Sequence, residues 1–326
     1  MFVITGGAGF IGSAIIWRLN ELNITDILVV DSLGQNSDKW KNLLNRVYLD
    51  YCEKDRFIDD IRNNKAYLKN VKYLIHMGAC SSTTETDNRY LIENNYEYTK
   101  TLAEYALRNN IRFVYASSAA TYGAGELGYS DMEDGLHLLR PLNMYGYSKH
   151  LFDLYASKNK MLNKIVGLKF FNIYGPNEYH KDEMRSVVSK AYLQIKENRQ
   201  VNLFKSYKPE FLNGEQKRDF LYIKEAVEIV RQIIFDDKIH GIFNIGSGVA
   251  HTWNDLVKEI FESLNIEPKI SYIDMPENLK SKYQYFTKAD MGKINNYIKI
   301  DDNYRFTLKN GIKDYVINYL EKEKYL

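Results

Sequence analysis

A tyrosine and a lysine four positions apart, Tyr145 and Lys149, are the residues whose types and spacing most directly suggest chemistry. On a helix, residues four apart project from the same face, one turn from each other. A nearby ammonium lowers the pKa of a phenol, because it stabilises the phenolate. We therefore expect Tyr145 to act as a base near neutral pH, while Lys149 keeps donors for a cofactor ribose.

A glycine-rich segment near the N-terminus has the context of a phosphate-binding loop. Residues 2–5 predict a short buried strand and residues 13–22 an amphipathic helix. Between them glycine recurs every third position, at Gly6, Gly9 and Gly12. Glycines permit a tight turn and close backbone approach, and the helix N-terminus offers free N–H groups to a pyrophosphate. This segment predicts a dinucleotide site.

The residues after the second predicted strand leave the identity of the dinucleotide open. Asp31 ends that strand, where an acid can accept hydrogen bonds from an adenosine ribose, as expected for NAD. Lys39, Lys41 and Lys54 follow it and could neutralise a 2′-phosphate, as expected for NADP.

Predicted strands and helices alternate through the first half of the chain. Further strands are predicted at 47–49, 73–76, 113–116 and 165–171, with a long helix at 89–108. This order predicts an α/β fold: a Rossmann-type doubly wound parallel sheet, with a smaller mixed α/β substrate lobe. We expect residues 1–170 to form the nucleotide-binding domain, with 218–246 returning to it. Residues 171–326 should form mainly the substrate lobe.

Composition narrows the class of protein. Hydrophobic residues make up 45% and charged residues 26% of 326, and a net charge of +2 predicts neither nucleic acid nor an anionic membrane as partner. Two unpaired cysteines and six histidines without ligand spacing predict no disulfide framework and no metal site. The first strand follows Met1 directly and no apolar run reaches membrane-spanning length, so we expect a cytoplasmic protein.

Four features now coincide in chain order: the glycine loop, the acid after strand two, a serine pair ending in Ser118, and the Tyr145/Lys149 pair. Together they resemble the extended short-chain dehydrogenase/reductase superfamily, which acts on nucleotide-activated sugars. The resemblance implies that serine, tyrosine and lysine work as one unit on a sugar hydroxyl, while a nicotinamide takes the hydride. By position, Ser118 is the serine, Tyr145 the base, and Lys149 the residue that holds the ribose.

A more specific resemblance rests on four segments. They are 78–85 (GACSSTTE), 116–123 (ASSAATYG), 145–149 (YGYSK) and 171–176 (FNIYGP), the last followed by His180 and Lys181. They are similar to the ADP-L-glycero-D-manno-heptose 6-epimerases, a family that makes the heptose precursor of the lipopolysaccharide inner core. The resemblance implies ADP-heptose or a related nucleotide sugar as substrate, a C6-keto intermediate, and a homo-oligomer, typically a pentamer. It also implies that Lys181 is a second acid/base, because hydride must return to the opposite face of C6.

The same resemblance assigns the cofactor contacts residue by residue. Those at the pyrophosphate are Gly6, Gly9, Phe10, Ile11 and Gly12, and those at the adenosine end are Asp31, Ser32, Lys39 and Lys54. The remaining contacts are Met77, Gly78, Ala79, Cys80, Ser81, Asn94, Lys149 and Ile173. From the residues alone, we expect Cys80 to be a packing residue and not a nucleophile, since no base is near it in sequence. Because the family's lysines at Lys39 and Lys54 contact NADP, the resemblance favours NADP over NAD.

Substrate contacts follow from the resemblance in the same way. They are Ser118, Asn172, Glu183, Lys190, Phe204, Lys205, Ser206, Tyr207, Arg218 and Tyr283. Glu183 and Lys190 stand where the family has a serine and a histidine, and the 205–217 loop is longer than the family's. These departures lie in the substrate lobe, so they leave the nucleotide and the exact sugar open.

Three functions other than heptose 6-epimerisation are compatible with this type of fold. Sugar-nucleotide 4,6-dehydratases carry an Asp-Glu pair where this chain has Ala119 and Ala120, so it lacks the proton donor for eliminating water. A UDP- or GDP-sugar 4-epimerase or reductase of the same superfamily remains open because of the altered substrate loop. A non-catalytic dinucleotide-binding protein would have no need of Ser118, Tyr145 and Lys149 together.

Overall fold

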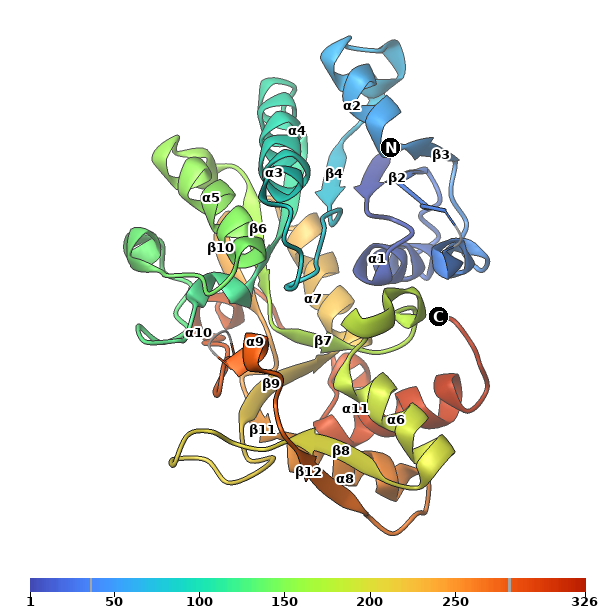
Figure 1. The fold of residues 1–326 in the computed structure, drawn as a ribbon. Helices are drawn as coiled ribbons and strands as arrows, with labels where there is room; N and C mark the ends of the chain where they lie inside the picture. Colours follow the sequence, from blue (N-terminus) through green and yellow to red (C-terminus); the bar gives the residue numbers. More distant parts are fainter. Residues whose placement is uncertain (36, 281–282) are drawn as a thin grey trace.

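A seven-stranded parallel sheet organises the upper part of the molecule in Figure 1. The computed structural model describes residues 1–35, 37–280 and 283–326. The sheet has the order β10-β6-β5-β4-β1-β2-β3. Its strands are β1 (Phe2–Thr5), β2 (Ile27–Asp31), β3 (Asp50–Glu53), β4 (Tyr73–His76), β5 (Arg112–Ser118), β6 (Val166–Phe170) and β10 (Gly241–Ile245). The chain runs outward from β1 to β3 and returns to β4 on the other side of β1, so the order reverses between β1 and β4. In such sheets a ligand crevice lies at that point, outside the carboxyl ends of the strands.

Helices cover both faces of this sheet, because its strands are apolar on both sides. Ile4 and Val29 face one buried cluster with helices α1 (Phe10–Asn20) and α7 (Ile223–Phe235). Val3 and Leu28 face a second cluster with α2 (Lys54–Arg62), α4 (Tyr98–Arg108) and α5 (Met144–Lys158). This arrangement confirms the predicted doubly wound parallel sheet.

Two predicted elements differ from the structure. The strand predicted at 47–49 is wrong: Val47 and Leu49 are 58% and 64% exposed, and the next four residues form β3 against β2. Apolar side chains suggested the strand, but the backbone that pairs with Leu28–Asp31 lies three residues later. The helix predicted at 89–108 is a continuous stretch of α3 (Asn88–Leu91), the π-helical η3 (Ile92–Glu97) and α4.

Smaller sheets lie below the main sheet in Figure 1. A three-stranded sheet contains β7 (Asn172–Tyr174), β9 (Lys217–Tyr222) and β11 (Ala250–Thr252), and β8 (Val201–Phe204) pairs with β12 (Ile270–Ile273). Helices α6 (Val187–Asn198), α8 (Trp253–Ser263) and α11 (Leu308–Tyr315) pack with them. A smaller mixed layer therefore accompanies the main sheet, as predicted, while the residue boundaries of the two domains stay a prediction.

Short helical segments complete the chain. They are η1 (Asp38–Leu43), η2 (Ala66–Asn70), η4 (Ala119–Tyr122), η5 (Glu133–Leu138), η6 (Met161–Asn163), η7 (Tyr179–Met184), α9 (Glu277–Lys280), α10 (Gly292–Asn295), η8 (Asp302–Tyr304) and the π-helical η9 (Val316–Leu320). Within the three described ranges, no helix has the length and apolar character needed to cross a membrane.

Candidate active site

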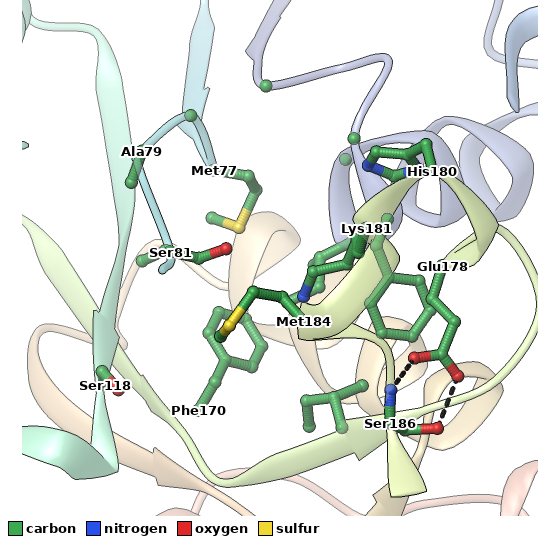
Figure 2. Close-up of a pocket in the computed structure, with 18 of the residues that line it drawn as sticks. Met77, Ala79, Ser81, Ser118, Phe170, Glu178, His180, Lys181, Met184 and Ser186 are labelled. Atoms are coloured by element: carbon green, nitrogen blue, oxygen red, sulfur yellow. Dashed lines mark hydrogen bonds between the residues drawn. The ribbon is translucent and has the colours of Figure 1, made fainter. Parts of the chain in front are cut away.

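A cavity of about 670 Å³ lies at the carboxyl ends of the central strands. Its wall is built from the loops after β1, β2, β4 and β5, from α5, and from η7 with the start of α6. Figure 2 shows part of this wall, with side chains from η7 and from the β4 and β5 loops turned toward the same space. The volume is that of a site for a small molecule or cofactor.

The glycine loop forms a cradle that only glycine can build. Gly6 has φ +66°, and a Cβ there would lie 2.5 Å from the Gly78 nitrogen. A Cβ at Gly12 would lie 2.1 Å from the Gly6 oxygen. Helix α1 begins after Gly9, which provides no side-chain cap to the first N–H groups. These free donors at a helix N-terminus, on the cavity wall, suit a pyrophosphate.

Asp31 and Lys39 meet at the end of β2. The Asp31 carboxylate accepts hydrogen bonds from the Ala8 and Ser32 backbone N–H groups, at 2.8 and 2.7 Å, and from the Lys39 amine at 2.5 Å. Lys54 lies on the same cavity and donates to the Asn94 side chain at 2.8 Å. Asp31, Lys39 and Lys54 thus line one cavity, which suits the adenosine part of a dinucleotide. Lys41, the third lysine considered for a 2′-phosphate, does not line it and pairs with Asp38 at 2.9 Å.

Helix α5 brings Tyr145 and Lys149 to the cavity beside Ser118. The Asn143 side chain caps the helix by accepting from the Gly146 N–H at 2.8 Å. A Cβ at Gly146 would lie 2.8 Å from the Ala120 oxygen, so glycine lets this helix approach the end of β5 closely. Tyr145, Lys149 and Ser118 all line the cavity, and their action as one catalytic unit stays a prediction.

The predicted lowering of the Tyr145 pKa is wrong for this structure. Burial raises the pKa of Tyr145, and the neighbouring Ser118 hydroxyl only partly opposes this. Lys149 is 4% exposed and its amine donates to the Ala116 carbonyl at 2.9 Å. Burial lowers the pKa of Lys149 to about 8. Helical spacing indicated the shared face, but it could not show that the amine turns to a backbone oxygen and that burial disfavours the phenolate.

Lys181 enters the cavity from η7 (Figure 2). Its amine lies 5.6 Å from the centre of the Phe10 ring, and the described residues offer it no hydrogen bond or ion pair. Burial lowers the pKa of Lys181, while the Glu178 carboxylate acts against this shift. The direction is the one expected for a buried lysine, and it makes the neutral amine accessible nearer neutral pH.

Most other predicted cofactor residues line the cavity too. They are Gly6, Gly9, Phe10, Ile11, Gly12, Ser32, Met77, Gly78, Ala79, Ser81, Asn94 and Ile173. Cys80 is not among the lining residues: its backbone is held at both polar groups by the Asn95 side chain, at 2.9 and 3.0 Å. Burial raises the pKa of the Cys80 thiol, which fits the packing role suggested by the sequence.

The predicted substrate residues divide into two groups. Ser118 and Asn172 line the cavity. The others do not: Glu183, Lys190, Phe204, Lys205, Ser206, Tyr207, Arg218 and Tyr283. Their assignment as substrate contacts stays a prediction.

Outside the cavity, these residues mostly contact one another or their neighbours. Glu183 and Lys190 pair at 3.4 Å in a separate surface hollow. Arg218 is buried between the rings of Trp253 and Tyr283, whose centres lie 5.7 and 5.0 Å from its guanidinium carbon. Because Trp253 lines the cavity, Arg218 lies directly behind the wall.

Several residues at the site escaped the sequence reasoning. Asn42 donates to the Ala8 and Asn177 carbonyls at 2.9 and 3.0 Å, which ties the glycine loop to the segment before Lys181. Glu178 is buried on the cavity wall, in the same motif as His180 and Lys181, so its position in that motif was an available signal. Within the described parts of the chain, no cluster of His, Cys, Asp and Glu is arranged to hold a metal ion.

The sequence matches a known family. The family model for the NAD dependent epimerase/dehydratase family matches residues 2–246. The chain therefore belongs to the NAD dependent epimerase/dehydratase family.

Within this family, its relatives include the ADP-L-glycero-D-manno-heptose-6-epimerases, which confirms the predicted resemblance. The one from Nitratidesulfovibrio vulgaris is 50% identical over 321 residues, covering 98% of each chain. The one from Fusobacterium nucleatum is 47% identical over 332 residues, covering 99% of each. The crystal structure of the Helicobacter pylori enzyme of that name has a TM-score of 0.80 and 28% identity, covering 97% of this chain and 95% of that one.

Proposed function

We propose that this protein inverts C6 of the heptose in ADP-D-glycero-D-manno-heptose. The product is ADP-L-glycero-D-manno-heptose, for the inner core of lipopolysaccharide, and the intermediate is a C6 ketone. The observation that carries the proposal is that Tyr145, Ser118 and Lys181 line one cavity together with the glycine cradle. Relatives of 50% and 47% identity that bear this activity in their names support the choice of substrate.

The residues of the cradle fit a dinucleotide, and we propose NADP. A Cβ at Gly6 or Gly12 would occupy space within 3 Å of backbone atoms, and the uncapped start of α1 offers its N–H groups. Lys39 and Lys54 would hold a 2′-phosphate, Asp31 the ribose beside it, and Lys149 the ribose of the nicotinamide. When bound, the nicotinamide supplies the chemistry of accepting a hydride from C6 and giving it back.

The side chains of the chain handle the protons and orient the sugar. Tyr145 takes the proton of the C6 hydroxyl as the ketone forms, and Ser118 donates a hydrogen bond to that oxygen. Lys181 comes from a different element, η7, and serves as the second acid/base after the exocyclic group has turned. Two proton-transfer groups are needed because the oxygen occupies different places in the two epimers. The apolar Phe10 ring beside Lys181 keeps its amine poorly solvated.

The remaining family properties extend the proposal. By resemblance we propose a homo-oligomer, with a pentamer as the family's typical assembly, and a cytoplasmic setting. The departures at Glu183, Lys190 and the 205–217 loop favour one competing candidate, a UDP- or GDP-sugar 4-epimerase or reductase. A panel of nucleotide sugars in a thermal-unfolding assay separates the two, because only the true ligand raises the transition strongly.

The direct test uses purified protein and ADP-D-glycero-D-manno-heptose without added cofactor. We expect the two C6 epimers to interconvert, as followed by NMR. Mass spectrometry of the nucleotide released on denaturation should find NADP. Release of NAD would correct the cofactor and leave the epimerase proposal intact, whereas absence of any epimerisation would refute the proposal.

A further inference from the structure

The loop that carries Lys181 has an unusual backbone. It leaves β7 at Gly175, passes through η7 and ends at Ser186, which caps helix α6. In its middle, Asp182 has φ +44° and ψ −117°, a conformation that non-glycine residues rarely adopt. Such a conformation persists only where the surrounding contacts over-determine it. The loop therefore needs contacts that hold its ends.

Glu178 supplies those contacts from inside the molecule (Figure 2). Its side chain is 1% exposed. One carboxylate oxygen accepts from the Ser186 backbone N–H at 2.5 Å, and the other accepts from the Ser186 hydroxyl at 2.7 Å and the Gly175 N–H at 3.3 Å. A single carboxylate thus joins the beginning of the loop to its end.

Lys181 is the charged group of the loop that faces this carboxylate. Burial raises the pKa of Glu178, and its contacts with Ser186 and the charge of Lys181 act against that shift. Tyr179 on the loop and Tyr315 from α11 also face Glu178. On the other side of Lys181, burial and the charge of Lys39 lower the pKa of His180 to about 4, so His180 is neutral. Nothing else described on the loop offers the Lys181 amine a partner, so its place depends on the backbone that carries it.

We propose that Glu178 is a positioning residue, which holds the Lys181 amine in the cavity by tying the two ends of the loop together at Ser186. This rests on the proposed role of Lys181 as the second acid/base. Glu178 transfers no proton to the substrate. It fixes the η7 backbone, and through it the path of the Lys181 side chain toward the cavity (Figure 2).

The first experiment compares Glu178→Gln with Asp182→Asn. The introduced glutamine has nearly the size of glutamate, but its NH₂ group is a donor and faces groups of the loop that are themselves donors. The hydrogen bonds that join the two ends of the loop are therefore weakened. Asp182→Asn removes one charge from the same loop at an exposed position, and asparagine tolerates positive φ. For Glu178→Gln we expect kcat to fall about 10- to 100-fold with KM within about threefold, since misplacing a catalytic group costs about that much. Amide hydrogen exchange should accelerate at 179–185 and nowhere else, and Asp182→Asn should match the wild type.

A second experiment measures the pKa of Lys181 in the absence of substrate. Competitive acetylation across a pH series, followed by peptide mass spectrometry, gives the pKa of each lysine. Ser186→Ala keeps the Glu178 charge and loosens the tie, so the Lys181 amine becomes more solvated and its pKa should rise toward the ordinary lysine value. Ser186→Thr keeps the hydroxyl and the α6 cap, and should restore the wild-type pKa.

The outcomes test the positioning role of Glu178 separately from the proposed function. Wild-type kcat and loop exchange in Glu178→Gln, or an unmoved Lys181 pKa in Ser186→Ala, would overturn the positioning role. If Glu178→Gln does not fold, the Ser186 pair decides alone. If the wild type does not epimerise ADP-heptose, the function falls, while exchange and acetylation still report whether Glu178 holds the loop.

Discussion

The cavity wall on the cofactor side and the wall on the substrate side are built differently. On the cofactor side, nearly every predicted residue lines the cavity, and most of these residues follow the carboxyl end of a strand in one parallel sheet, while Asn94 lies on η3, Lys149 on α5 and Ile173 in β7. Of the predicted substrate contacts, only Ser118 and Asn172 line the cavity; Ser118 is the last residue of β5, and Asn172 begins β7 shortly after β6 ends. The other predicted contacts do not line the cavity, although η7, α6 and β9, which carry Glu183, Lys190 and Arg218, contribute other side chains to its wall.

This difference shows which part of the site the fold itself determines. Strand ends in a parallel sheet bring distant residues to one edge without help from long-range side-chain contacts. Residues on loops of the smaller layer reach a common site only through tertiary packing.

Tyr145→Phe removes the proposed base while leaving the cavity shape and the glycine cradle unchanged. We expect kcat for C6 epimerisation to fall by about 10³-fold, within the range that a positioned acid/base contributes. The amount of nucleotide released per protein on denaturation should equal that of the wild type. A variant with near wild-type turnover would remove Tyr145 from the chemistry.

Lys149→Met should stabilise the nucleotide-free protein while abolishing its function. Burial places the pKa of Lys149 at about 8 in the folded protein, against 10.5 when unfolded, so at pH 7 the folded state bears the cost of a buried ammonium. That difference corresponds to about 3 kcal/mol in the free energy of unfolding. It is fully present below pH 8 and disappears between pH 8 and 10.5, because over that range the unfolded chain binds more protons and wild-type stability rises with pH.

Urea unfolding of the nucleotide-free wild type and Lys149→Met at pH 7 and pH 10.5 measures this effect. We expect the variant to be more stable at pH 7 and the two proteins to converge at pH 10.5. A variant less stable at pH 7 would show that the Lys149 contact with the Ala116 carbonyl outweighs the burial of the charge.

Lys39→Met tests the choice of cofactor. A charge-assisted hydrogen bond to a 2′-phosphate is worth about 1.5–3 kcal/mol, so NADP affinity should fall about 10- to 100-fold. NAD affinity should stay within about threefold, as measured by titration calorimetry on protein freed of nucleotide. Lys69→Met, which removes an exposed lysine far along the chain, is the matched control. Equal losses for NAD and NADP would contradict a role in binding a 2′-phosphate.

Lys190→Met should have the smallest effect, because Lys190 pairs with exposed Glu183 outside the cavity. Here we expect KM for the nucleotide sugar to rise by no more than about threefold, with kcat unchanged, in steady-state assays. A thirtyfold rise in KM would show that Lys190 reaches the bound ligand, because the substrate wall closes over it. The difference between the cofactor wall and the substrate wall would then hold only for the protein without ligand.

Local patterns in the sequence predicted many of the residues that line the cavity. The glycines with their flanking strand and helix, Asp31 at the end of a strand, and the spacing of Tyr145 and Lys149 each carry their structural meaning within a few residues. The family motif added Lys181. The burial of a side chain cannot be predicted from such local patterns, so the shift in the pKa of Tyr145 was predicted in the wrong direction.

Contacts between segments far apart in the chain were also out of reach. Asn42 meets Asn177 across 135 positions, and Asn95 reaches Ser148 across 53 positions. Such amide contacts leave no periodic signal in the sequence. From the sequence alone, a buried asparagine that makes a long-range contact cannot be told from an exposed one. Glu178 is the intermediate case: its partner Ser186 is only eight positions away, but the loop between them follows no regular pattern.

The central claim is that this cavity removes hydrogen from a sugar carbon and returns it to the same carbon. The most direct measurement is epimerisation of ADP-D-glycero-D-manno-heptose that carries deuterium at C6, in ordinary water with no cofactor added. The account predicts that the L-glycero epimer forms and keeps its deuterium, as read by mass spectrometry and NMR. Product that has exchanged its deuterium for solvent hydrogen, or no epimer at all, would contradict the account.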